Sequence, residues 1–150
     1  MPKDLNLVIA GSSSDISYIN KLKKLIKSSV SPSRIILLGN VPWKTMNILY
    51  RQSKIFVIST EIEACPNIAL EAMAAGCVIL SSDKPPLPEM FSGSSLDYKA
   101  RDVSVLSKKI IEVLEDRNLQ LKLKKLSSKR ATYFSWSMCV DETYSALTNW

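Results

Sequence analysis

The first half of the chain alternates short apolar runs with segments whose apolar residues recur at three- and four-residue spacing. The short runs predict β-strands, and the longer spacing predicts helices with one buried face. Strands that alternate with helices in this way are typical of a parallel sheet covered by helices. We expect the strands at Leu5–Ala10, Arg34–Leu38, Ile55–Ile58 and Cys77–Leu80, with a weaker fifth at Ser95–Tyr98. The pattern therefore predicts an α/β fold with a parallel sheet of four to five strands flanked by helices.

The last third of the chain keeps only the helical spacing. After Asp102, the residues Leu106, Ile110 and Val113 fall on one helix face, and a final helix is expected from about Ser137 to Leu147. A chain of 150 residues with 46% hydrophobic and 23% charged residues lies in the usual range for one domain with one core. We predict a single Rossmann-like domain over residues 1–150, with a helical C-terminal third.

Cysteine usage and apolar run length indicate the compartment. No apolar run approaches the roughly 18 to 20 residues of a membrane-spanning helix, and residues 1–6 lack the layout of a signal peptide. The three cysteines, Cys65, Cys77 and Cys139, are not closely paired, which argues against a disulfide framework and a zinc knuckle. We therefore expect a cytoplasmic location, with Cys77 buried in a strand and Cys65 closer to the ligand crevice.

The sequence contains no histidine. Histidine is the commonest general base and the commonest metal ligand in proteins. A histidine-dependent catalytic triad or zinc site within this chain is therefore excluded. Any chemistry has to come from carboxylates, amides and hydroxyls.

The formal net charge of +6 comes largely from two helical stretches rich in basic residues. A basic chain can bind nucleic acid, anionic lipid or a phosphorylated small molecule. No aromatic residues interleave with these charges to stack on bases, which argues against nucleic acid. We interpret the stretches as solvated helix faces, so that any membrane contact is peripheral. The residues concerned are Lys21, Lys23, Lys24, Lys27, Lys122, Lys124, Lys125, Lys129 and Arg130.

The loop after the third predicted strand carries the most unusual group of residues. Ligands of open parallel sheets bind outside the carboxyl ends of the strands, which here means the loops after Ile58 and Leu80. Asn67 is a suitable N-cap for the helix that follows Pro66. The free N–H groups at such a helix start attract phosphate. These features indicate a site for a nucleoside diphosphate.

Two carboxylates flank this helix start, because Glu63 lies in the loop and Glu71 about one turn into the helix. A carboxylate is an acceptor with two oxygens and can take both hydrogens of a vicinal diol such as a ribose. The alternative is that both acids only serve the helix dipole, which favours negative charge near a helix N-terminus. The two interpretations differ in whether either residue affects ligand binding.

The segment that contains both glutamates also resembles a known family. Residues 59–79, STEIEACPNIALEAMAAGCVI, are similar to the donor-site signature of the family-four retaining glycosyltransferases of the GT-B fold. The similarity runs from about Leu5 to Leu147 and so covers nearly the whole chain. The other matching pieces are Leu7–Gly11, Ile36–Val41, Leu80–Glu89, Phe134–Trp136 and Tyr144, the last two of which resemble the family's closing helix.

The resemblance implies a role for each residue of the segment. Glu71 would bind the ribose hydroxyls of a nucleotide sugar, and Glu63 would contact the donor sugar and stabilise charge at its reacting carbon. No metal or other cofactor is expected, because amides and basic side chains of this fold stabilise the leaving diphosphate. The residues that would offer backbone amides to the donor are Ala64, Cys65, Pro66, Asn67 and Ile68.

Two parts of the family pattern have no match in this sequence. One is an earlier strand with an arginine and a lysine that grip the diphosphate, and the other is an N-terminal acceptor-binding domain. Lys3, Lys44 and Arg51 are more simply surface charges than substitutes for that pair. The resemblance therefore implies the donor-binding half of a hexosyltransferase that uses a UDP- or GDP-linked sugar. This half would be inactive without an acceptor domain or a companion chain.

Two other functions stay open on the sequence. One is a binding module that holds a nucleotide or sugar nucleotide without turnover. The other is a regulatory domain of the flavodoxin type, which requires a cluster of acidic residues at the strand ends. Asp83 alone follows the fourth predicted strand, which is too little for such a cluster.

Overall fold

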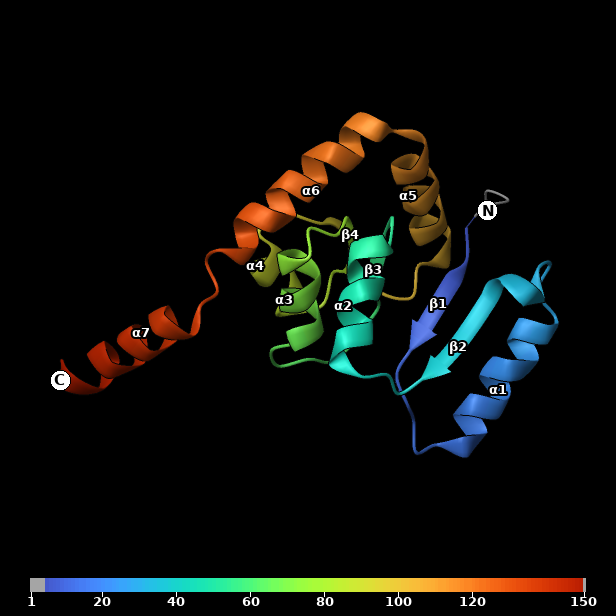
Figure 1. The fold of residues 1–150 in the computed structure, drawn as a ribbon, viewed down its shortest axis with the longest axis horizontal. Coiled ribbons are helices and arrows are strands. Elements are labelled where there is room, and N and C mark those ends of the chain that lie inside the picture. Colours follow the sequence, from blue (N-terminus) through green and yellow to red (C-terminus); the bar gives the residue numbers. More distant parts are fainter. Residues whose placement is uncertain (1–4, 150) are drawn as a thin grey trace. The chain divides into compact units, whose positions relative to one another are not determined.

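The computed structural model describes residues 5–149, which divide into two compact units with a boundary after Met46 (Figure 1). In the first unit, the parallel strands β1 (Leu7–Ala10) and β2 (Ile35–Gly39) pair with Leu7 opposite Ile35. Helix α1 (Ile16–Lys27) makes the crossover that a parallel pair requires, followed by the short turn η1 (Pro32–Arg34).

The second unit is built around a parallel sheet in the order β3-β4-β5. Phe56 of β3 pairs with Ile79 of β4, and Leu80 of β4 pairs with Leu96 of β5. Helix α2, which begins before the boundary, leads into this unit. The elements are α2 (Trp43–Gln52), β3 (Phe56–Ile58), α3 (Asn67–Ala74), β4 (Ile79–Ser82), α4 (Leu87–Phe91), β5 (Leu96–Tyr98), α5 (Val103–Glu115), α6 (Arg117–Ala131) and α7 (Trp136–Thr148).

The core of the second unit lies around its central strand. All four residues of β4 are buried, as expected for a parallel strand covered on both faces. Val78 and Leu80 pack in one cluster with Val113 of α5 and Leu123 of α6. Phe91 and Met73 are also completely buried. Helices α5 and α6 therefore fix the sheet whose strand ends carry the candidate site.

Gly76 allows α3 to end and the chain to turn into β4. Its φ of +71° lies in the left-handed region, which glycine enters without a Cβ clash. A Cβ at this position would lie 3.0 Å from Ser128 Oγ of α6. The left-handed backbone therefore favours glycine at this position, and the Ser128 side chain leaves little space for a Cβ.

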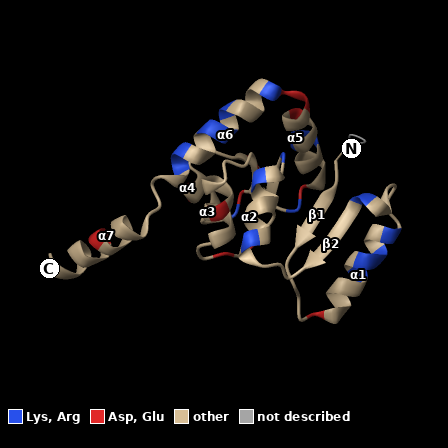
Figure 2. Cartoon of the chain, viewed as in Figure 1, with Lys and Arg blue, Asp and Glu red and all other residues tan. Residues whose placement is uncertain are grey.

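Lysine and arginine residues lie along α1 and α6, as Figure 2 shows. Arg130 departs from the prediction of a solvated face, because its guanidinium is half-buried. Its Nε donates to the Met90 carbonyl at 2.8 Å and its Nη2 to the Glu89 carbonyl at 3.0 Å. The guanidinium carbon also lies 4.9 Å from the centre of the Phe134 ring. Arg130 therefore caps the carboxyl end of α4, where unpaired carbonyls attract cations.

The predicted α/β architecture with parallel strands and flanking helices is confirmed, although the strands form sheets of two and three. The predicted fourth strand, Cys77–Leu80, begins too early, because β4 is Ile79–Ser82. The Cys77 N–H instead donates to the Ala72 carbonyl at 3.0 Å and closes the end of α3. The single domain over residues 1–150 stays a prediction. Within residues 5–149, no helix is long and apolar enough to cross a membrane.

Candidate functional site

The candidate site lies at the carboxyl edge of the three-stranded sheet. Because β3, β4 and β5 are parallel, their last residues, Ile58, Ser82 and Tyr98, lie at the same edge. The connections that leave this edge are residues 59–66, 83–86 and 99–102. Two of them are joined directly, since the Asp83 N–H donates to the Tyr98 carbonyl at 2.9 Å and the Asp83 carboxylate accepts from the Ala100 N–H at 2.9 Å.

Helix α3 starts at this edge with an N-terminus that has no side-chain cap. The predicted N-cap at Asn67 is wrong, because Asn67 is the first helical residue and Pro66 is the N-cap. The ring of Pro66 holds φ at −73°, and its carbonyl accepts the Ala69 N–H at 2.9 Å. The N–H groups of Asn67 and Ile68 precede that bond and have no acceptor within the helix. They can therefore donate to an anion.

Pro66 differs from its neighbours in the predicted amide segment. A proline has no N–H, so Pro66 cannot donate to a donor sugar or diphosphate, and its side chain is buried. Ala64, Cys65, Asn67 and Ile68 are exposed and keep their N–H groups. The segment thus presents its amides on both sides of a buried proline that sets the entry into α3.

Glu63 lies on the exposed loop before α3. The Thr60 hydroxyl is within hydrogen-bonding distance of the Glu63 Oε1 atom at 3.3 Å and of the Ile62 carbonyl at 3.1 Å. One hydroxyl hydrogen can serve only one of these acceptors at a time. The carboxylate of Glu63 is therefore accessible to a ligand and is oriented by a weak contact.

Glu71 lies on α3 and is held by a tyrosine from α2. The Tyr50 hydroxyl donates to the Glu71 Oε2 atom at 3.0 Å, and the Tyr50 side chain is only 4% exposed. Burial, and then the neighbouring Glu71 carboxylate, raise the pKa of Tyr50 well above its usual value. The tyrosine stays a protonated donor and fixes one carboxylate oxygen. No sequence motif indicated this partner.

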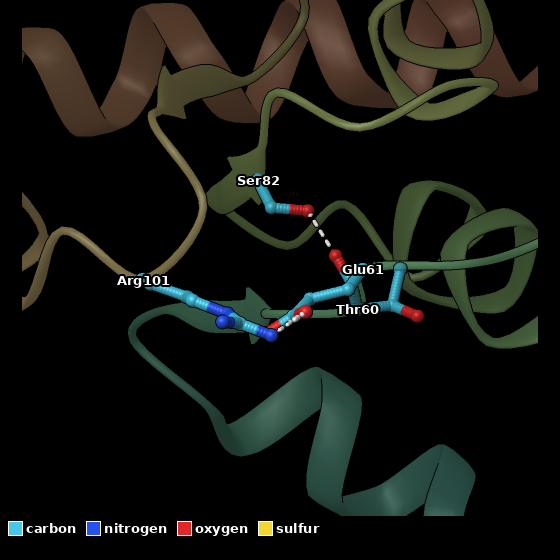
Figure 3. Close-up of polar contacts among 4 residues, drawn as sticks. All are labelled: Thr60, Glu61, Ser82 and Arg101. Carbon is cyan, nitrogen blue, oxygen red and sulfur yellow. Dashed lines mark hydrogen bonds and ion pairs between the residues drawn. The ribbon is translucent and has the colours of Figure 1, made fainter.

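A second feature that sequence reasoning missed is an ion pair across the strand ends (Figure 3). Arg101 Nε donates to Glu61 Oε1 at 2.7 Å, and Arg101 Nη2 donates to Glu61 Oε2 at 2.6 Å. The Arg101 guanidinium lowers the pKa of the Glu61 carboxyl below its usual value. On the neighbouring residue, the Thr60 carbonyl accepts from the Ser82 hydroxyl at 2.6 Å. The partners lie far apart in the sequence and share no motif.

A cavity of about 250 Å³ opens beside Glu71. Its lining is mainly apolar and joins α3 to the end of α6 and the residues that follow it. The lining residues are Leu70, Glu71, Ala74, Ala131 and Phe134. Glu71 therefore both accepts from the Tyr50 hydroxyl and lines a mainly apolar cavity.

Arg51 and Lys44, two of the basic residues considered as substitutes for the diphosphate-binding pair, contact neighbours on their own helix. Arg51 Nε donates to Asn47 Oδ1 at 2.8 Å within α2, and the Lys44 ammonium lies 5.8 Å from the Trp43 ring centre. Lys3 lies outside the described residues. Among residues 5–149, no group of three or more cysteine, aspartate and glutamate side chains could hold a metal ion.

Most of the sequence matches one family model. Residues 1–130 match the family model described as "Glycosyl transferases group 1". The chain belongs to this family. The glycosyltransferase part of the prediction is thereby confirmed.

Two kinds of relatives extend this finding. O-antigen chain mannosyltransferase B of Escherichia coli is 28% identical over 125 residues, which is 83% of this group 1 chain and 33% of the relative. The chain therefore spans about a third of that curated relative. Among solved structures, Anabaena HepE in complex with UDP superposes with a TM-score of 0.90 at 14% identity, over 99% of this chain and 42% of HepE.

A solved C-terminal domain is similar as well. The C-terminal domain of the group 1 glycosyl transferase LpcC from Francisella tularensis has a TM-score of 0.76 at 20% identity. The match covers 85% of this chain and 68% of that domain. The group 1 chain therefore shares its fold with HepE and with the LpcC domain.

The cysteines provide a direct check on the site's exposure. Cys65 and Cys139 are exposed, whereas Cys77 is buried, and its burial raises the pKa of the Cys77 thiol to about 11. Because the thiolate is the reactive form, we expect Cys65 to be labelled at least about tenfold faster than Cys77 at pH 7.5. Mass spectrometry of a Cys139→Ser chain labelled with iodoacetamide measures both rates.

The same labelling experiment tests the ligand crevice. A bound nucleotide should protect Cys65 and leave the slow labelling of Cys77 unchanged. Faster labelling of Cys77 than of Cys65 would contradict the described burial of the segment between α3 and β4.

Proposed function

We propose that this group 1 chain is the donor-binding part of a retaining, family-four glycosyltransferase of the GT-B fold. The observation that carries the proposal is the pairing of Glu71 with Tyr50 close to an uncapped helix start, with Glu63 exposed in the preceding loop. HepE, which has the same fold, was solved with UDP and with UDP-glucose. We extend this ligand class to the present chain as a nucleoside diphosphate sugar.

Each part of the site has a task in this proposal. Tyr50 holds one oxygen of Glu71, so that the carboxylate is oriented to accept the two ribose hydroxyls. The N–H groups of Asn67 and Ile68 donate to the diphosphate at the positive end of α3. Glu63 contacts the donor sugar and stabilises positive charge that develops at the anomeric carbon. The leaving diphosphate is stabilised by amides and basic groups, without a metal ion.

The transfer itself exchanges one carbon–oxygen bond for another. The bond from the anomeric carbon to the diphosphate breaks, and the nucleoside diphosphate leaves with the electron pair. The acceptor oxygen forms the new bond and gives up its proton. With retention, the acceptor arrives on the face from which the diphosphate leaves, so a departing phosphate oxygen is placed to take that proton.

We infer that an acceptor-binding domain or a companion chain completes the enzyme. The length of the relatives supports this, since the chain spans 33% of the mannosyltransferase and 42% of HepE. Helix α7 supports it as well, because all its residues are exposed and several are large and apolar. Apolar residues gathered on one exposed helix are typical of a protein interface. The residues are Trp136, Met138, Val140, Tyr144 and Leu147.

Calorimetric titration with UDP, GDP, UDP-glucose and GDP-mannose tests the proposal. We expect saturable binding of one nucleotide series, with affinity as weak as millimolar. The absence of any binding at millimolar concentration would overturn the proposal. Sugar-nucleotide binding without transfer, once an acceptor domain is joined, would instead favour a binding module.

The basic helices lead to a separate prediction about membranes. We propose a cytoplasmic protein whose membrane contact is peripheral, through the lysines of α1 and α6. Such contact is electrostatic and should weaken strongly as salt rises from about 0.1 M to 0.5 M. Co-sedimentation with vesicles that contain anionic lipid measures it, and neutral vesicles are the control. Binding that persists in high salt would contradict a purely electrostatic contact.

A further inference from the structure

The loop that carries Glu63 is tied to the sheet at two successive residues (Figure 3). The Thr60 carbonyl accepts from the hydroxyl of Ser82, a completely buried residue at the end of β4, at 2.6 Å. Both carboxylate oxygens of Glu61 accept from Arg101, in the turn after β5, at 2.7 Å and 2.6 Å. The loop is therefore held through its backbone at one residue and through its side chain at the next.

The turn that presents Arg101 is itself well defined. The Asp83 carboxylate accepts the Ala100 N–H at 2.9 Å, and the Asp102 N–H donates to the Lys99 carbonyl at 2.9 Å. Arg101 has a φ of +68°, in the left-handed region that a residue with a Cβ enters at a cost. The described contacts thus hold a non-glycine residue where glycine would fit more easily. The backbone gives no reason for an arginine at this position, whereas the two hydrogen bonds from its guanidinium to Glu61 do.

We propose that Arg101 and Ser82 are positioning residues for Glu63. Ser82 fixes the backbone of Thr60, and Arg101 fixes the side chain of Glu61. The Thr60 hydroxyl, held in place in this way, orients the Glu63 carboxylate through their contact at 3.3 Å. The inference rests on the proposed contact between Glu63 and the donor sugar. It adds a mechanism by which the ends of β4 and β5 control where that carboxylate lies.

Because the Arg101–Glu61 ion pair is exposed, it can position the loop without adding much to the global stability of the domain. The side chains of Arg101 and Glu61 are 81% and 45% exposed, and ion pairs on the surface add little to the free energy of unfolding. Two parallel hydrogen bonds between a guanidinium and a carboxylate nevertheless fix their mutual orientation. The pair should therefore order the loop locally without determining whether the domain folds.

Hydrogen exchange tests the tie without any ligand. We expect Arg101→Gly to raise amide exchange in residues 60–64 by about fivefold or more, since the loop opens locally. The melting temperature should stay within about 2 °C, because the substitution also relieves the left-handed strain. Lys99→Ala, which removes a positive charge from the same turn, should change neither quantity. Unchanged exchange in Arg101→Gly would overturn the proposal.

Salt and a second substitution show whether the ion pair itself is responsible. Wild-type exchange in residues 60–64 should rise in about 1 M NaCl, where exposed charges are screened, whereas Arg101→Gly should not respond. Adding Glu61→Gln to Arg101→Gly should have no further effect, because the two residues act as one contact. If the two substitutions raised amide exchange additively, the Arg101–Glu61 ion pair would not be what holds the loop.

Binding of the intact donor tests positioning itself. With the nucleotide series that the wild type binds, Arg101→Gly should keep the affinity for UDP or GDP within about twofold. Affinity for UDP-glucose or GDP-mannose should fall about three- to tenfold, which corresponds to about 0.7 to 1.4 kcal/mol. Arg101→Lys keeps the charge but not the two parallel hydrogen bonds, so its affinity for the sugar nucleotide should lie between those of the wild type and Arg101→Gly. Ser82→Ala should also lower the affinity for the sugar nucleotide.

Comparison with Glu63→Gln separates this inference from the proposed function. If Glu63→Gln weakens sugar-nucleotide binding but Arg101→Gly and Ser82→Ala do not, the positioning role is wrong and the donor site stands. If Glu63→Gln has no effect on the sugar nucleotide, the contact of Glu63 with the sugar is wrong, and positioning fails with it. Parallel losses in all three variants support both.

Discussion

Glu71→Gln is expected to lower nucleotide affinity by about tenfold or more. The substitution keeps the size and one acceptor oxygen of the side chain but removes its charge. Hydrogen bonds to a charged group contribute about 1.5 to 3 kcal/mol each, and about 1.4 kcal/mol corresponds to a tenfold change in Kd. Two ribose hydroxyls bonded to one carboxylate therefore make this the largest binding effect of any single substitution in the site. Calorimetric titration with UDP and GDP measures it.

The structure supplies controls for the Glu71 experiment. Glu112→Gln removes the same charge from an exposed position on α5, away from the strand ends, and should leave binding unchanged. Tyr50→Phe leaves the Glu71 charge but removes the hydroxyl that donates to it at 3.0 Å, so it should weaken binding less than Glu71→Gln. Equal nucleotide affinity for the wild type and Glu71→Gln, at measurable binding, would rule out the ribose contact. The Glu71→Gln substitution would then report only the helix dipole, as a modestly lower melting temperature.

Glu63→Gln is expected to act mainly on transfer. Its carboxylate should contact the sugar and the charge that develops at the reacting carbon, so affinity for the bare nucleoside diphosphate should hardly change. Loss of one electrostatic contact to a transition state typically costs about a hundredfold or more in kcat. We therefore expect a moderate loss of sugar-nucleotide affinity and a loss of about two orders of magnitude in transfer rate. The rate is measured with the chain joined to an acceptor domain.

The pattern of losses decides how Glu63 acts. A contact made equally with substrate and transition state would raise KM and leave kcat unchanged, whereas a contact made only in the transition state lowers kcat. Glu112→Gln again serves as the charge-matched control. Glu63→Gln could instead lower the affinity for bare UDP or GDP as much as the affinity for the sugar nucleotide. In that case Glu63 contacts the nucleotide, and the proposed division of roles between the two glutamates is wrong.

Local patterns were enough to predict the class of fold and that the chain is a glycosyltransferase. Strands buried on both faces read as apolar runs, and helices with one buried face repeat their apolar residues at a fixed spacing. These signals lie within ten or fifteen residues, so they survive without knowledge of the rest of the chain. The segment from Glu63 to Glu71 is equally local, since one loop and the first turns of one helix carry both glutamates.

The local pattern of apolar residues did not suffice to predict where β4 begins and ends. Cys77 looks like a strand residue because it is apolar and buried, but its N–H is used to close α3. Ser81 and Ser82 look like loop residues because they are polar, yet they complete β4 and are completely buried. Each serine hydroxyl finds a backbone carbonyl, which compensates the cost of burying a polar group. Sequence spacing cannot show that compensation.

The sequence by itself thus predicted roughly where the strands and helices lie, that the chain is a glycosyltransferase, and that one loop and the helix after it carry the two glutamates. Only the tertiary structure decided what holds those glutamates. Tyr50 meets Glu71 from 21 positions away, and Arg101 meets Glu61 from 40 positions away. Hydrogen bonds and ion pairs act over about 3 Å in space whatever the separation along the chain. Partners brought together by the pairing of β3, β4 and β5 therefore leave no periodic trace in the sequence.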